Sequence, residues 1–168
     1  MNKVQAYKIN QEDEDNIERF KTMFYVILVI LTFNIFFSPI VVNGYSMENT
    51  LKNNQPLMIY KIVTNCEYND IIVVYAGHNI PGSTYIIKRV LAVSGDLVEI
   101  HDGKFFRNEE EIFEPYIKEP METEGFMPAY IIPEGEIFLM GDNRNESGDS
   151  REYGTFSQKD IVGKIICN

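Results

Sequence analysis

The chain has 168 residues, enough for one domain with an appendage. Its formal net charge of −10 argues against a nucleic-acid partner, which requires a basic face. A hydrophobic fraction of 45% and a charged fraction of 24% are typical of a globular protein and exclude a disordered chain. From two cysteines and two histidines we expect neither a Cys/His zinc site nor a disulfide framework, and no cofactor motif is present.

Residues 23–42 form an apolar run (MFYVILVILTFNIFFSPIVV), and no charged residue lies between Lys21 and Glu48. About 20 helical residues at 1.5 Å each span roughly 30 Å, which is the hydrocarbon thickness of a bilayer. The sequence therefore predicts a transmembrane anchor over residues 23–42. Pro39 lies near its end, where it can stop or kink the helix.

Two other interpretations of this run are a cleaved secretory signal peptide and a buried helix of a soluble protein. A signal peptide has a short basic segment before its apolar core and a small-residue cleavage site after it. Here the residues before the run include five acidic ones, and no A-x-A sequence follows it. An uncharged run of this length is also unusual for a soluble helix, so an uncleaved anchor fits better.

The cations beside the run predict its orientation. Arg19 and Lys21 lie directly before it, and the first cation after it is Lys52. Lys and Arg near the ends of a span favour the cytoplasmic side. We therefore expect a single-pass protein of the cell membrane, with a cytoplasmic tail at residues 1–22 and an extracytoplasmic domain at residues 43–168.

The outer domain consists of short segments rich in Ile, Val, Tyr and Phe, separated by turn residues. Residues 108–130 are acidic, contain proline and are weakly patterned, so we expect a surface excursion there. The predicted fold class is all-β, with a complex and mostly antiparallel strand order, preceded by one transmembrane helix. The expected strands are residues 57–62, 70–75, 84–93, 97–100, 104–107, 136–140 and 161–166.

Residues 141–154 (GDNRNESGDSREYG) alternate Asp and Arg among Asn, Ser and Gly. The simplest interpretation is a polar surface loop with local ion pairs, each of which contributes little to stability. Such a segment can also brace a site through charge-assisted hydrogen bonds. The residues concerned are Asp142, Arg144, Asp149 and Arg151.

Lys88 lies in a predicted strand and shares one face with Ile86, Val90 and Ala92. Burial among apolar neighbours lowers the pKa of a lysine, and a neutral amine can act as a general base near pH 7. The alternative is an edge or snorkelling lysine, because the opposite face of this strand is also apolar.

Ser46 follows the apolar run closely and needs a base if it is a nucleophile. His78 lies in a turn-like stretch and His101 flanks a turn, so neither context marks a catalytic base. The chain has no G-x-S-x-G sequence. Activation by a lysine is the remaining option for a serine nucleophile, and Lys88 is the candidate.

Taken together and in order, three segments resemble the type I signal peptidases of bacteria, which are membrane-anchored serine proteases with a Ser-Lys dyad. Residues 46–50 (SMENT) resemble the S-M-x-P-T pattern that follows the anchor in this family. Residues 85–96 (YIIKRVLAVSGD) resemble Y-x-x-K-R-V leading to G-x-P-G-D. Residues 141–154 match G-D-N-R-x-x-S-x-D-S-R-x-x-G at every defined position. The resemblance leaves out only the N-terminal tail and residues 108–130.

The resemblance implies a membrane-bound endopeptidase that removes signal peptides from exported preproteins by cutting after Ala-x-Ala. It implies that Ser46 is the nucleophile, Lys88 the general base, and Ser147 the residue that orients the lysine amine. The Ser46 backbone N–H looks like one oxyanion donor. Some relatives add a serine hydroxyl where this chain has Gly44, so the second donor is left open between backbone and water.

The resemblance also implies how the site is braced and how substrate binds. The substrate would bind extended, as a strand added beside the segments that carry the dyad, with small side chains in shallow apolar pockets. The implied pocket residues are Met47, Leu51 and Ile86, and the implied bracing network is Asp142, Arg144, Asp149 and Arg151.

Three residues depart from the family patterns: Asn49 and Ser94 replace prolines, and Ala92 replaces a glycine. None of them removes a reacting group, but they suggest an altered substrate channel and a peptidase devoted to few substrates. Two other hypotheses are a non-proteolytic assembly factor or chaperone for surface structures such as pili, and a purely structural membrane-anchored β domain. A chaperone needs neither Ser46 nor Lys88, so the presence of both favours the enzyme.

Overall fold

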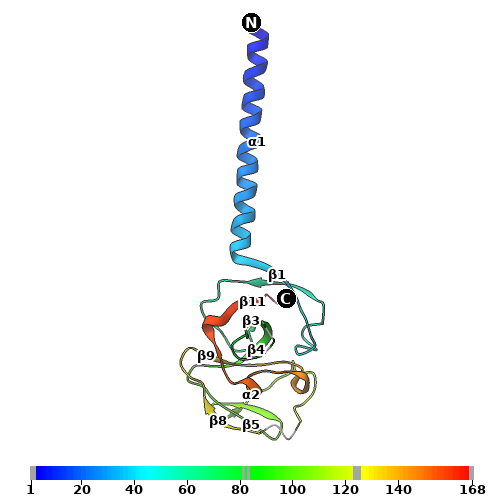
Figure 1. Ribbon diagram of the computed structural model, residues 1–168, viewed down its shortest axis with the longest axis vertical. Helices are drawn as coiled ribbons and strands as arrows, with labels where there is room; N and C mark the ends of the chain where they lie inside the picture. Colours follow the sequence, from blue (N-terminus) through cyan, green and yellow to red (C-terminus); the bar gives the residue numbers. More distant parts are fainter. Residues whose placement is uncertain (1–2, 81, 83, 123–125, 167–168) are drawn as a thin grey trace. The chain divides into compact units, whose positions relative to one another are not determined.

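The computed structural model describes residues 3–80, 82, 84–122 and 126–166, with side chains from residue 14 onward. The chain divides into two compact units, Met1–Phe37 and Ser38–Asn168. The first unit is helix α1 (Lys3–Phe36), shown in blue in Figure 1. Its segment Glu14–Phe36 is long and apolar enough to cross a membrane.

The helix ends earlier than the sequence predicts. The expected anchor extended to Val42, whereas α1 ends at Phe36 and β1 (Phe37–Val41) follows directly. Pro39 accounts for the difference, because its ring would clash with the preceding helical turn and it disfavours the helical conformation at Ser38. The second unit therefore begins at Ser38 rather than at residue 43.

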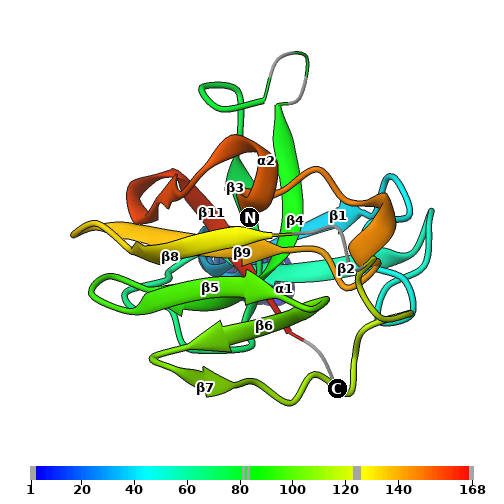
Figure 2. The same ribbon diagram turned by 90° about the horizontal axis from the view of Figure 1, so that it is seen from below.

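The second unit consists of two sheets, and the predicted all-β class is confirmed. Seven strands form the first sheet in the order β1-β2-β11-β3-β4-β9-β10, and four form the second in the order β7-β6-β5-β8 (Figure 2). The strand pairs are antiparallel wherever their register is defined. The elements are β2 (Pro56–Tyr60), β3 (Ile71–Tyr75), β4 (Tyr85–Val93), β5 (Leu97–His101), β6 (Lys104–Arg107), β7 (Glu110–Glu111), β8 (Met127–Ile131), β9 (Glu136–Met140), η1 (Arg144–Glu146), α2 (Ser150–Tyr153), β10 (Phe156–Ser157), η2 (Gln158–Asp160) and β11 (Ile161–Ile165).

The core supports the strand on which the candidate base lies. β3 is buried on both faces: Ile72 and Val74 belong to one apolar cluster, Ile71 and Val73 to another. This is why its sequence reads as an uninterrupted apolar run. β4 pairs with β3 along residues 85–89, so it is held against a fully buried neighbour.

The expected surface excursion at residues 108–130 is only partly correct. The segment contains β7 and the start of β8, and Met121 packs into the cluster that includes Leu91 and Phe138. The sequence pattern is weak because β7 has two residues and most of β8 is exposed, so neither alternates between apolar and polar side chains.

Candidate active site

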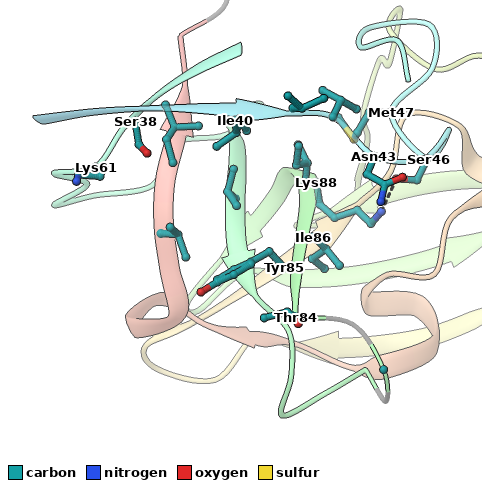
Figure 3. Close-up of a pocket in the computed structure, with 18 residues that line it drawn as sticks. Ser38, Ile40, Asn43, Ser46, Met47, Lys61, Thr84, Tyr85, Ile86 and Lys88 are labelled. Carbon is teal, nitrogen blue, oxygen red and sulfur yellow. Dashed lines mark hydrogen bonds between the residues drawn. The ribbon is translucent and has the colours of Figure 1, made fainter. Parts of the chain in front are cut away.

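Ser46 and Lys88 come together although they lie 42 positions apart in the sequence. Ser46 lies in the loop between β1 and β2, and Lys88 lies near the middle of β4. The Lys88 Nζ donates a hydrogen bond of 2.6 Å to the Ser46 Oγ (Figure 3). This is the geometry a neutral amine needs to accept the hydroxyl proton from a serine nucleophile.

Burial changes the protonation of Lys88. Its side chain is only 3% exposed, and it pairs across the strands with Ile72, which is fully buried. Burial lowers the pKa of Lys88 from 10.5 to about 8, while the charge of Asp149 partly opposes this shift. A sizeable fraction of the amine is therefore neutral at mildly alkaline pH. Of the residues predicted to share its face, Ile86 and Val90 pack in one apolar cluster, whereas Ala92 lies beyond a bulge in β4 and packs in another.

Asp142 links the two chain segments that carry Ser46 and Lys88. Its carboxylate accepts two hydrogen bonds from Arg89, at 2.8 and 2.6 Å, and one from the Thr50 hydroxyl. Arg89 follows Lys88 on β4, and Thr50 follows Ser46 in its loop. Asp142 is fully buried, so these bonds are made where water does not compete.

Asp149 organises the segment after β9. It accepts a hydrogen bond from the Gly141 N–H at 2.9 Å, two from the Arg151 guanidinium, each at 2.8 Å, and one from the Ser147 hydroxyl at 2.8 Å. The resemblance implied that Ser147 orients the lysine amine. Here its hydroxyl donates to Asp149 instead, and the Lys88 amine bonds to Ser46 alone among the described residues.

Arg144 stabilises the same segment after β9 and is itself held by Glu114. Its guanidinium is fully buried and binds the Glu114 carboxylate through both terminal nitrogens, one of the two bonds being 2.6 Å. Its Nε donates to the Gly141 carbonyl at 3.0 Å. The excursion at residues 108–130 therefore supports the site, through a partner the sequence did not point to.

Comparisons with known proteins show the family of the chain. The sequence model of the family described as "Signal peptidase, peptidase S26" matches residues 17–167. The chain belongs to the signal peptidase family S26. Signal peptidase I P of Bacillus subtilis subsp. natto is 37% identical over 151 residues, which cover 82% of this chain and 79% of that protein. Probable signal peptidase I-1 of Synechocystis sp. is 34% identical over 129 residues, which cover 72% of this chain and 65% of that protein.

A solved structure supports the same assignment for the fold. A signal peptidase I from Enterococcus faecalis V583 superposes with a TM-score of 0.52 at 24% identity, over 62% of this chain and all of that one. The chain is thus a type I signal peptidase with an N-terminal membrane anchor.

A pocket of about 630 Å³ in this signal peptidase opens beside the Ser-Lys pair (Figure 3). It runs from Ser46 and Lys88, past Ile86, to Ser38 and Lys61 at its other end. The pocket thus extends well beyond Ser46 and Lys88. Its lining consists of Ser38, Ile40, Val41, Val42, Asn43, Gly44, Ser46, Met47, Ile59, Lys61, Val73, Gly82, Thr84, Tyr85, Ile86, Ile87, Lys88 and Val162.

Two of the three expected pocket residues lie in the pocket and one does not. Met47 and Ile86 line it, whereas Leu51 is 2% exposed and packs in the core with Ile59 and Ile71. The turn after Ser46 explains this: the Leu51 N–H bonds to the Met47 carbonyl at 2.8 Å, and the turn directs Leu51 into the core.

Gly44 also lines the pocket, with a φ of +106° that favours glycine. Its N–H donates to the Asn53 Oδ1 at 3.0 Å and is therefore already engaged. The three departures from the family patterns, Asn49, Ala92 and Ser94, do not line the pocket, so they give no support to an altered channel.

Several residues of the site were missed by the sequence analysis. Arg89, Thr50 and Glu114 hold the Asp and Arg residues that were predicted, and Asn143 contacts the nucleophile segment. The sequence could have pointed to three of these residues, because Thr50, Arg89 and Asn143 fall inside the matched motifs. Nothing in the sequence around Glu114 indicated a role for it. Within the described part of the chain, no three Cys, His, Asp or Glu side chains are grouped to bind a metal. Cys167 lies outside that part.

Gly141→Ala should slow cleavage sharply. An added Cβ would lie 2.5 Å from the Ser46 carbonyl oxygen and closer still to the Ser147 Oγ, so the Ser46 backbone must move. A displacement of about 1 Å can cost about 100-fold in rate, and we expect a fall in kcat of that order. Gly148→Ala is the matched control, because its Cβ would lie 3.0 Å from the movable Tyr153 ring and at ordinary contact distance, 3.6 Å, from the Glu152 carboxylate. Equal rates for the two variants would contradict the prediction.

Proposed function

We propose that this signal peptidase hydrolyses the peptide bond after the signal peptide of exported preproteins, with Ser46 as nucleophile and Lys88 as general base. The observation that carries the proposal is the 2.6 Å bond between the Lys88 Nζ and the Ser46 Oγ in a site where burial lowers the lysine pKa to about 8. The neutral amine accepts the hydroxyl proton as the Ser46 Oγ attacks the carbonyl carbon. It then donates that proton to the leaving amine, and water hydrolyses the acyl-enzyme.

The substrate binds as an added strand along residues 85–88. This part of β4 pairs with β3 on one side, while pairing with β9 on the other side begins only at Arg89. Backbone groups on that second side are open to an extended peptide. Met47 and Ile86 lie at the Ser46 end of the pocket and favour a small apolar side chain, such as alanine, before the cleaved bond.

The helix is proposed to lie in the membrane with residues 1–22 in the cytoplasm and the catalytic unit outside. Arg19 and Lys21 precede the apolar segment, and no cation follows it before Lys52. This orientation places Ser46 on the side of the membrane where signal peptides of exported proteins emerge. The lipid bilayer is then a permanent partner of the enzyme.

Ser46→Ala should abolish cleavage of a preprotein with an Ala-x-Ala site, assayed in detergent with the full chain. Loss of a nucleophile typically lowers kcat by more than about 10³-fold. Ser38→Ala is the matched control, since Ser38 lines the far end of the same pocket and should be dispensable. The wild-type rate should rise with pH and reach half of its maximum near pH 8, because only neutral Lys88 can accept the proton.

Two outcomes would contradict the proposed function. Cleavage that survives Ser46→Ala at the same bond would show that Ser46 is not the nucleophile. A preprotein left uncut by wild type, including preproteins encoded near its gene, would favour the non-proteolytic assembly factor over the enzyme.

A further inference from the structure

Asn143 contacts the backbone on both sides of the Ser46 amide. It lies three residues after the end of β9 and is fully buried. Its backbone N–H donates to the Ser46 carbonyl at 3.0 Å, and its Nδ2 donates to the Tyr45 carbonyl at 3.1 Å. No other residue in the described part of the chain bonds to both of these carbonyls.

The Tyr45 carbonyl belongs to the same peptide group as the Ser46 N–H. The peptide bond between these residues is trans, so its carbonyl and its N–H point in opposite directions. The Tyr45 carbonyl accepts one bond from the Asn143 Nδ2 and another from the Glu48 N–H, each at 3.1 Å. The bond from Asn143 is the one made by a side chain, and it helps to direct the Ser46 N–H away from Asn143. That N–H has no acceptor among residues 3–80, 82, 84–122 and 126–166, and Ser46 itself lines the pocket.

We propose that Asn143 is a positioning residue that aims the Ser46 N–H at the oxyanion formed during cleavage. The proposal rests on the proposed function, because it assumes that Ser46 is the nucleophile. When the Ser46 Oγ bonds to the scissile carbonyl carbon, its proton passes to Lys88 and the carbonyl π electrons move onto the oxygen. The Ser46 N–H stabilises the resulting negative charge only if it points at that oxygen.

Glu146 holds the Asn143 amide in a single orientation. The second Nδ2 hydrogen goes to the Glu146 Oε2 at 3.2 Å, while the Asn143 Oδ1 is buried without a donor among the described residues. A reversed amide would place Oδ1 against two acceptors, Glu146 and the Tyr45 carbonyl. A buried acceptor without a donor, such as the Asn143 Oδ1, is unfavourable. That the amide keeps this orientation indicates that the two bonds from its Nδ2 outweigh the cost.

The test compares Asn143→Ala with Asn145→Ala in the detergent assay and in NMR of the full chain. Asn145 lies on the same loop, but its amide bonds to the Pro120 carbonyl and the Glu122 N–H, away from Ser46. We expect Asn143→Ala to lower kcat about 10- to 100-fold with KM and the pH midpoint near 8 unchanged, and to shift the Ser46 amide ¹⁵N resonance. Asn145→Ala should change none of these quantities.

Glu146→Ala provides a second variant that leaves Asn143 in place. Glu146 is exposed, so the protein should fold normally, and release of the amide should lower kcat by about threefold to tenfold. A wild-type kcat in Asn143→Ala, a loss confined to KM, or an unshifted Ser46 resonance would overturn the proposal. If wild type cleaves and Ser46→Ala does not, such a result refutes the role of Asn143 alone. If Ser46→Ala still cleaves, the proposed function falls, and this inference with it.

Discussion

Lys88→Met should give a protein that no longer cleaves preproteins but is more stable than wild type at neutral pH. Activity is lost because methionine cannot accept the Ser46 proton, and we expect a fall in kcat of more than about 10³-fold. Stability rises because burial of Lys88 is unfavourable: the amine must either lose its proton or stay charged without its hydration shell. Methionine removes this cost. The loss of activity and the gain in stability both result from removal of the buried amine.

The size of the gain follows from the pKa. The Lys88 pKa falls from 10.5 in the unfolded chain to about 8 in the folded one, so between these values the unfolded chain binds more protons and stability rises with pH. Below about pH 8 the full penalty applies, about 3 kcal/mol at 1.36 kcal/mol per pH unit. The lost bond to Ser46 offsets about 1 kcal/mol, which leaves about 2 kcal/mol in favour of methionine.

Urea denaturation of both proteins in detergent at pH 7 and pH 10.5 measures this gain. Lys88→Met should be the more stable protein at pH 7 and no more stable than wild type at pH 10.5, where the loss of the bond to Ser46 outweighs the small remaining penalty. Lys104→Met is the control, because Lys104 is about half exposed on β6 and should give no gain at either pH. Equal stability of Lys88→Met and wild type at pH 7 would mean that Lys88 is hydrated in solution.

Glu114→Gln should destabilise the protein by about 3–5 kcal/mol. The change leaves the fully buried Arg144 guanidinium without its carboxylate, and an uncompensated buried charge is costly. The matched control is Glu111→Gln, which breaks the half-exposed pair with Lys104 and should cost less than about 1 kcal/mol.

The urea midpoints of Glu114→Gln, Glu111→Gln and wild type check this second prediction. The Arg144 Nε also holds the Gly141 carbonyl, so Glu114→Gln should lower the cleavage rate at temperatures where the protein stays folded. Similar midpoints for the two variants would contradict the prediction, since they would place the Glu114–Arg144 pair in contact with water.

Local rules predicted those parts of the molecule that depend on neighbours in the sequence. The seven predicted strands are present, and none of their ends is shifted by more than two residues. The apolar surroundings of Lys88 follow from strand alternation, because successive side chains point to opposite faces. The predicted end of the helix was too late because the apolar run continues into β1. Pro39 indicated that the helix could not continue through the whole run.

Partners distant in the sequence could not be predicted in this way. Arg144 was identified as a bracing residue, but its carboxylate comes from Glu114, in a segment without a pattern. Leu51 was placed in the pocket because it is apolar and close to Ser46, whereas the turn after Ser46 directs it into the core. Asn143, unlike Asn145, is a defined position of the matched motif, but the motif does not show that its amide bonds to the Tyr45 carbonyl of another loop.

The position of β11 affects when activity can arise during synthesis. This strand, which follows all the other described strands in the sequence, lies inside the first sheet, between β2 and β3. On one side of β11 lie β1 and β2, whose connecting loop carries Ser46. On its other side lie β3 and β4, and β4 carries Lys88. A growing chain that has emerged only as far as residue 160 contains both reacting side chains but not the strand that holds their two halves together. We expect such a chain to be inactive, because β11 does not yet hold the segments of Ser46 and Lys88 together.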